Sequence, residues 1–175
     1  MTKSHSSRPA VRRSPRRRLA HLLQLLFARV SSLTTKANRL RARVATVPSW
    51  ADLRTCIDGL LHELQTAARE LAARAAALGA RLDPVRASAP RRAAGGPKLD
   101  ELLQIPTQLA SALFAECQQC GSRLCTLTTI ANEAHDEASA RVAFGLMRTL
   151  EKQLWLMWPH LADTHHPFPL PARLA

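Results

Sequence analysis

The feature that most constrains this chain is a helical pattern near its C-terminus. Between residues 138 and 161, apolar side chains recur every three or four positions: Val142, Leu146, Leu150, Leu154, Met157 and Leu161. That spacing places them on one face of an α-helix, and such a face can be buried only against other helices. Asp136 and Glu137 precede the pattern and Pro159 ends it, as is typical of helix boundaries. The rest of the chain is therefore expected to supply partner helices.

Three further stretches carry the same kind of apolar stripe. The first helix is predicted over residues 17–44, the second from a capping Ser49 to a terminating Gly79, and the third from Thr107 to about Ala134. Almost no loop precedes the fourth helix, residues 137–161, so the last two helices should be antiparallel neighbours. A long crossover, residues 80–97, separates the second and third helices. The predicted fold is an all-α, ferritin-like four-helix bundle with a long crossover between the second and third helices and a disordered basic N-terminal arm.

Positive charge is concentrated in the N-terminal part of the chain. Twelve of the 25 Lys and Arg residues precede Ala51, whereas none of the 13 Asp and Glu residues does. Bases and acids balance from Ala51 onward, so the net charge of +12 belongs to residues 1–50. A localised field of this kind indicates a polyanionic partner, nucleic acid before anionic lipid. Because neither a membrane-spanning run nor a secretory segment is visible, we expect a cytoplasmic, nucleoid-associated protein without a membrane partner.

Residues 1–16 show no periodicity and are expected to form the disordered basic arm. Residues 17–162 would form the bundle and residues 163–175 a Pro-rich tail. Basic side chains of an arm can contact phosphates without sequence choice. Organelle targeting and simple solubilisation are alternative interpretations of the same composition. The predicted DNA-binding residues are Lys3, Arg8, Arg12, Arg13, Arg16, Arg17 and Arg18.

The four cysteines do not suggest a disulfide framework. Cys117 and Cys120 fall on the apolar stripe of the third helix, so we predict that they are small buried hydrophobic residues. Zinc is an alternative for the C-x2-C-x4-C spacing, although no second C-x2-C pair is present. Asp58 and His62, four positions apart on one helix face, are a candidate metal pair, with a solvated histidine as the simpler interpretation. Asp163 and His166 also have a ligand-like spacing, but they lie in the Pro-rich tail.

Residues 129–161 resemble the C-terminal half of the Dps-type mini-ferritins, the DNA-binding proteins of starved cells. Weaker matches in the same register are Thr35-Lys36, Leu53 with Ile57 and Asp58, Arg74 with Leu78-Gly79, and a short helical turn at residues 99–105. The resemblance covers residues 19–161 and implies a ferritin-like fold, an oligomeric shell, DNA binding and iron chemistry. The residues that fit the family pattern best are Asp136, Glu137, Ser139, Ala140, Arg148, Leu150, Lys152, Leu154 and Trp155.

The iron site of that family lies between two subunits of a dimer, and its ligand positions are mostly replaced here. They correspond to Arg39, Arg54, Asp58, Arg69 and Ala73, so only Asp58 keeps a ligating side chain. Arginine stays charged and does not ligate, whereas iron oxidation needs several oxygen and nitrogen ligands. We therefore predict that the ferroxidase centre is absent, that no cofactor is bound, and that Asp58 makes a structural contact with arginine across a dimer interface.

By the same resemblance, acidic residues near the last turn are candidates to line a pore of the shell. They are Glu133, Asp136 and Glu137, and their alternative role is ordinary helix-end charge.

Together these observations predict sequence-independent binding and protection of duplex DNA by a Dps-like oligomer, between a dimer and the family's dodecamer. Many arms on one assembly would raise the avidity far above the affinity of a single arm. Two alternatives stay open. One is an iron-binding or iron-oxidising mini-ferritin that uses other ligands, and the other is an inert subunit that co-assembles with an active paralogue.

Overall fold

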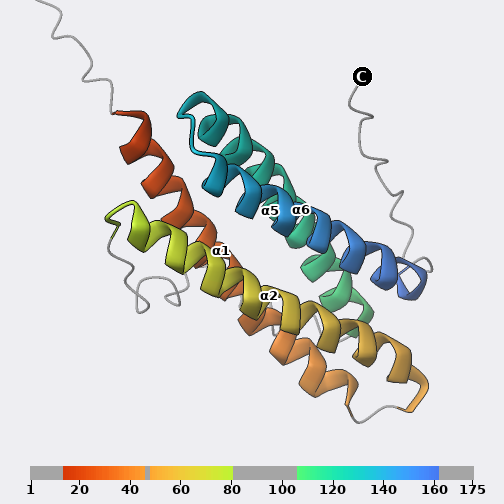
Figure 1. Cartoon of the computed structure of the whole chain (residues 1–175). Coiled ribbons are helices and arrows are strands. Elements are labelled where there is room, and N and C mark those ends of the chain that lie inside the picture. The colour runs from red at the N-terminus through yellow and green to blue at the C-terminus, as the bar shows by residue number, and fades with distance from the viewer. Residues whose placement is uncertain (1–13, 46–47, 81–105, 162–175) are drawn as a thin grey trace, which may run out of the picture.

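A computed structural model of the chain describes residues 14–45, 48–80 and 106–161. These residues form an all-α four-helix bundle, as predicted, with a long connection between the second and third of its long helices (Figure 1). None of the described helices is both long and apolar enough to cross a membrane. The elements are α1 (Pro15–Val44), the 3-10 turn η1 (Pro48–Trp50), α2 (Ala51–Ala77), α5 (Pro106–Glu133), α6 (Glu137–Met157) and the 3-10 turn η2 (Trp158–His160).

Each helix lies beside two others, and the helices that touch are antiparallel. The neighbouring pairs are α1 with α2, α5 with α6, α1 with α5, and α2 with α6. Between α1 and α5, Arg29 contacts Gln119, while the later Lys36 contacts the earlier Glu116. The end of α2 and the start of α5 therefore lie at opposite ends of the bundle (Figure 1). Residues 81–105, which include the predicted turn at 99–105, lie outside the described residues.

The starts of α1 and α2 differ from the predictions in informative ways. Helix α1 begins at Pro15, two residues before the predicted start, because proline suits the first helical position, where no backbone donor is needed. Arg16 is therefore helical rather than part of an arm. The prediction that Ser49 caps α2 was wrong: Ser49 lies within η1, and Trp50 occupies the N-cap position without a side-chain hydrogen bond. The fixed φ of Pro48 fits the tight turn that replaces the expected cap.

The predicted stop at Gly79 is confirmed. Gly79 has a φ of 78°, and the amides of Gly79 and Ala80 donate to the carbonyls of Ala76 and Ala75, each at 2.9 Å. This is a Schellman motif, in which glycine adopts the left-handed conformation at low cost. The same arrangement ends α5, where His135 has a φ of 52° and the Asp136 amide donates to the Ala131 carbonyl at 2.8 Å. A turn this short makes α5 and α6 antiparallel neighbours, as expected.

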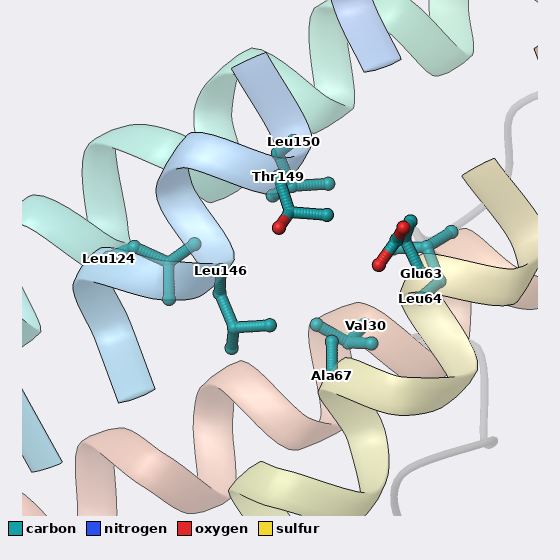
Figure 2. Close-up of a pocket in the computed structure, with 8 residues that line it drawn as sticks. All are labelled: Val30, Glu63, Leu64, Ala67, Leu124, Leu146, Thr149 and Leu150. Carbon is teal, nitrogen blue, oxygen red and sulfur yellow. The ribbon is translucent and has the colours of Figure 1, made fainter. Parts of the chain in front are cut away.

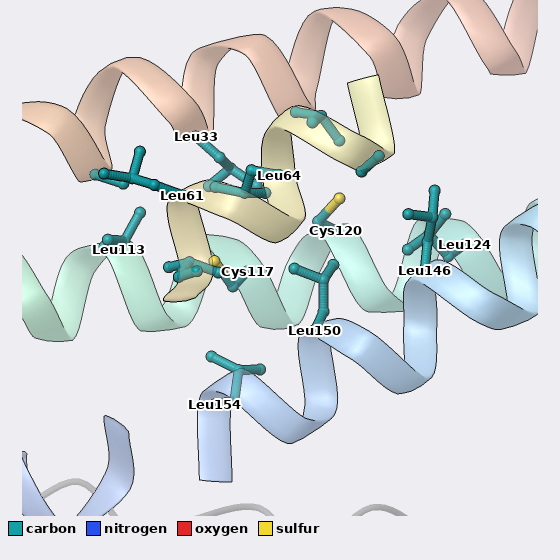
Figure 3. Close-up of a cluster of buried hydrophobic side chains, with 14 of the residues drawn as sticks. Leu33, Leu61, Leu64, Leu113, Cys117, Cys120, Leu124, Leu146, Leu150 and Leu154 are labelled. Atoms are coloured by element: carbon teal, nitrogen blue, oxygen red, sulfur yellow. The ribbon is translucent and has the colours of Figure 1, made fainter. Parts of the chain in front are cut away.

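The apolar stripes of the four helices meet in one continuous core, part of which is shown in Figure 3. Cys117 and Cys120 are fully buried among leucines there, as predicted for small hydrophobic residues. Burial of a leucine side chain contributes about 1.5–3 kcal/mol, so this core is the main stabilising element of the bundle. The largest fully buried side chains are Leu19, Leu23, Leu26, Leu33, Leu40, Ile57, Leu60, Leu64, Leu71, Leu124, Leu127 and Met157.

Candidate nucleic-acid interface

The first turn of α1 carries three consecutive exposed arginines. Arg16, Arg17 and Arg18 precede the first buried residue, Leu19. The backbone amides of Arg17 and Arg18 donate to the carbonyl of Ser14 at 2.9 and 3.1 Å, which starts the helix. The remaining predicted arm residues, Lys3, Arg8, Arg12 and Arg13, lie outside the described residues.

The first turn of α1 concentrates positive charge. The turn contains no acidic residue, and none of the described carboxylates pairs with its three guanidinium groups. The N-terminal end of a helix already carries a partial positive charge, so each added cation there costs about 0.3–1 kcal/mol at low salt. A bound phosphate would relieve this repulsion.

Two other basic residues of α1 contact α5. Arg29 donates to the Oε1 atom of Gln119 at 3.0 Å and lies 3.6 Å from Glu116 Oε2, and Lys36 pairs with Glu116 Oε1. The Glu116 side chain is only 19% exposed. These two cations therefore neutralise a partly buried carboxylate between α1 and α5.

The C-terminal end of α1 presents a second group of exposed arginines, Arg39, Arg41 and Arg43. Arg41 Nε lies 2.5 Å from Asp58 Oδ1 of α2. Both side chains are about half exposed, so the ion pair is worth at most about 1 kcal/mol. Sequence analysis missed this pair because Arg41 occupies no position of the family motif. A shallow hollow between α1 and α2 is lined here by Asn38, Arg41, Ala42, Ala45, Arg54 and Asp58.

The five positions of the degenerate family iron site do not converge within one chain. Asp58 and Arg54 share the hollow with Arg41, whereas Arg69 lies about 22 Å along α2 from Arg54. Arg69 donates to Thr66 Oγ1 at 3.0 Å. Within the chain, Asp58 contacts Arg41, which is not among the three arginines at the family's ligand positions. A contact of Asp58 with an arginine across a dimer interface stays a prediction.

Metal-ligand clusters are absent from the part of the chain that the structure describes. No three His, Cys, Asp or Glu residues gather there closely enough to hold an ion. In the candidate metal pair of Asp58 and His62, the Asp58 carboxylate forms an ion pair with Arg41. The central pocket in Figure 2 has Glu63 as the only acid among its eight lining residues, which are otherwise aliphatic apart from Thr149. The described interior thus lacks the carboxylate set with which ferritin-like bundles bind iron.

The described cysteines also differ in reactivity. Burial raises the pKa of Cys117 to about 12 and that of Cys120 to about 11, so neither is a thiolate at neutral pH. Cys125 is exposed and its Sγ lies 3.1 Å from Met147 Sδ. Burial, and next the charge of Asp52, raise the pKa of the partly buried Cys56.

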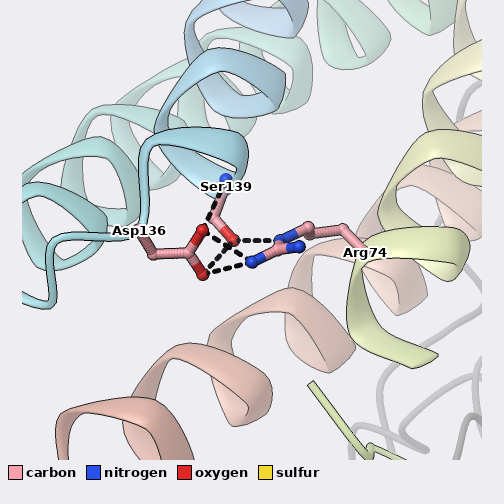
Figure 4. Close-up of polar contacts among 3 residues, drawn as sticks. All are labelled: Arg74, Asp136 and Ser139. Carbon is pink, nitrogen blue, oxygen red and sulfur yellow. Dashed lines mark hydrogen bonds and ion pairs between the residues drawn. The ribbon is translucent and has the colours of Figure 1, made fainter. Parts of the chain in front are cut away.

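Asp136 joins the end of α2 to the start of α6, as Figure 4 shows. Its carboxylate accepts hydrogen bonds from the Ser139 amide at 3.1 Å and from the Ser139 hydroxyl at 2.9 Å. Both carboxylate oxygens also lie 2.6 Å from Arg74 Nη2. Arg74 Nε donates to Ser139 Oγ at 2.8 Å. Partial burial alone would raise the pKa of Asp136, but the hydrogen bonds from Arg74 and Ser139 outweigh it and lower the pKa. Of the three pore candidates, Asp136 is thus bound within the chain, while Glu133 and Glu137 are exposed.

Comparison with known proteins shows similarity of fold only. No protein-family model matches the sequence, and no curated protein matches it significantly. The crystal structure of the protein XCC3681 from Xanthomonas campestris pv. campestris is similar, with a TM-score of 0.69. The superposition covers 87% of this chain and 93% of the XCC3681 chain, at 15% sequence identity. That likeness establishes the helical bundle and says nothing about its activity.

Proposed function

We propose that this chain is a divergent Dps-like bundle that binds and protects duplex DNA without sequence choice, through residues 1–18. The observation that carries the proposal is the acid-free basic N-terminus, which continues into the exposed Arg16, Arg17 and Arg18 of α1. Phosphate contacts supply most of the affinity of non-specific DNA binding. Three adjacent cations at the positive end of a helix are suited to contact successive phosphates.

Two features support the family assignment. The order and directions of the four helices, with one long connection between the second and third, match those of ferritin-like bundles. In addition, Arg74, Asp136 and Ser139, which all belong to the resemblance with Dps-type proteins, form a single hydrogen-bonded cluster. The described interior, whose only buried polar side chains are Ser139 and Gln153, weighs against the iron-oxidising alternative.

An oligomer would present several basic segments to one DNA molecule. Exposed large apolar side chains on α6, Phe144, Trp155 and Leu156, are of the kind that subunit contacts cover. We propose an assembly between a dimer and a dodecamer, of this chain alone or with a paralogue. Multiple attachment would raise the avidity by about 100-fold or more over a single arm.

Salt dependence of binding tests the role of the first turn. For the triple variant R16Q/R17Q/R18Q, the slope of log K against log salt on random duplex DNA should become less steep by about 2–3, because each lost phosphate contact removes about 0.9. Fluorescence anisotropy of labelled duplex at four salt concentrations measures the slope.

A variant with the same loss of charge elsewhere separates a local contact from a general charge effect. R123Q/R141Q/R148Q removes three exposed arginines from α5 and α6 and should leave the slope nearly unchanged. Equal slopes for the two triple variants, or no change for the first, would overturn the assignment of these contacts to α1.

A further inference from the structure

Helix α6 carries two large aromatic side chains that the bundle leaves about half exposed. Phe144 is 49% exposed and Trp155 is 55% exposed. They are eleven positions, or about three helical turns, apart, so both lie on the same side of the helix. The buried residues Leu146 and Leu150 of α6 lie on another side, which packs into the core. The two aromatic residues thus offer apolar surface that a partner can cover.

Two opposite charges lie between these aromatic residues on the same side of α6. Arg148 follows Phe144 by four positions, and Glu151 precedes Trp155 by four positions, so all four residues form one stripe. Arg148 and Glu151 are exposed, and none of the ion pairs among the residues that the structure describes includes either of them. This outer stripe therefore has the order aromatic, basic, acidic, aromatic.

That order is complementary to itself. When two copies of a helix pack antiparallel about a two-fold axis, each residue meets the one that is equally far beyond the axis on the other copy. With the axis between Thr149 and Leu150, Phe144 faces Trp155 of the second copy. Arg148 faces Glu151 of the second copy, and the symmetry repeats both contacts. No other antiparallel register pairs all four members of the outer stripe with one another.

We propose that the outer stripe of α6 is a contact surface for a second copy of this chain, which binds antiparallel through the same four residues. The inference rests on the proposed function only for the expectation of an assembly. Buried aromatic pairs supply attraction, and the opposite charges supply register. Helix α6 packs beside α2 and α5, so α1 lies diagonally across the bundle from it. The contact therefore leaves the basic segments of both copies open to DNA.

An exchange of charges between two copies tests the proposal. Sedimentation velocity of the full chain without DNA, over a range of concentrations, measures the dissociation constant. R148E and E151R should each weaken association by at least about 100-fold, because each variant places like charges opposite one another twice. An equimolar mixture of the two variants should associate like the wild type, because every contact then joins a glutamate to an arginine. An ion pair within one helix cannot produce this rescue.

Matched variants make the result specific. R123E inverts an exposed arginine of α5, away from the outer stripe, and should associate like the wild type. F144S removes an aromatic side chain without a change of charge and should weaken association by about 10-fold or more. R148Q, which is part of the control variant for DNA binding, creates no like-charge contact and should weaken association much less than R148E. Circular dichroism checks that each variant is helical.

Three results would each overturn the proposal: a monomeric wild type, association that R148E and E151R leave unchanged, or a mixture of these variants that stays dissociated. The proposed DNA binding fails or stands separately, because residues 1–18 lie outside this contact. Monomeric variants should still bind DNA with the lower avidity of a single basic segment. DNA binding by a monomeric wild type would keep the DNA-binding role and reject the contact.

Discussion

At the scale of single residues, the contact of Asp136 with Arg74 and Ser139 has two structural effects. It satisfies amide donors at the start of α6 and connects that start to the end of α2, 62 positions away. The two charged side chains are 13% and 23% exposed, so water screens them less than it screens the Arg41–Asp58 pair. Removing one partner of such an ion pair destabilises the fold, because the remaining charge is left partly buried and unpaired.

Replacement of Asp136 should therefore destabilise the bundle. We expect D136A to lower the free energy of unfolding by about 2–3 kcal/mol, combining a lost helix cap with an unpaired Arg74. Chemical denaturation at pH 7 measures this change. E133Q, which alters an exposed carboxylate three residues earlier, should stay within about 0.5 kcal/mol of the wild type. Equal effects of the two variants would show that the cluster does not stabilise the fold.

The same carboxylate predicts a pH dependence. The pKa of Asp136 is lower in the folded chain than its ordinary value of 3.8. Its contribution to stability is therefore fully present above about pH 5 and is lost as the pH falls through 3.8 toward the folded-state pKa. The difference in unfolding free energy between wild type and D136N should shrink over that range. A difference that stays constant down to pH 2.5 would contradict the interpretation.

At the scale of elements, α2 and α6 approach closely at Gly59. A methyl group on Gly59 would lie 3.2 Å from Gln153 Oε1, an atom that is buried and has no hydrogen-bond partner among the described residues. Glycine inside a helix costs about 1 kcal/mol relative to alanine. The close approach of Gln153 therefore explains why a poor helix former occupies this position.

A double-mutant cycle tests this packing. G59A should be neutral or destabilising in the wild type, because crowding opposes the gain in helix propensity. In a Q153A background it should stabilise by about 0.5–1 kcal/mol, which gives a coupling energy near 1 kcal/mol. G121A, with no atom within 4 Å of the added methyl, serves as the control and should show no coupling with Q153A. Coupling below about 0.3 kcal/mol for G59A would refute the contact.

Sequence patterns predicted the elements well because helix burial leaves a local periodic signal. The stripes, Gly79 and the turn before α6 all follow from neighbouring residues. Contacts between distant residues left no such signal. Arg74 with Asp136, Arg41 with Asp58, and Cys56 with His160 depend on how the helices align, and only the first of these pairs coincided with residues of the family pattern. The start of α2 was misplaced because η1 uses Pro48 instead of a serine cap.

At the scale of the whole molecule, the excess positive charge is confined to the N-terminal part of the sequence. The chain from Ala51 onward is neutral, and the described buried side chains of the bundle are hydrophobic apart from Ser139 and Gln153. The excess charge lies in residues 1–50 and is exposed at both ends of α1. This division is suited to a scaffold that carries a basic segment, and the proposed DNA-binding residues all precede Leu19, the first buried residue of α1.

The most direct test is a gel-shift titration of random duplex DNA at low salt. It should compare the intact chain with a variant that lacks residues 1–13 and carries R16Q/R17Q/R18Q, after circular dichroism has shown both to be helical. Helix α1 begins at Pro15, so this variant keeps every buried residue of the bundle. We predict that the intact chain shifts the DNA and that the variant loses at least about 100-fold in affinity. Equal binding of the two proteins, or no binding by the intact chain, would contradict the account.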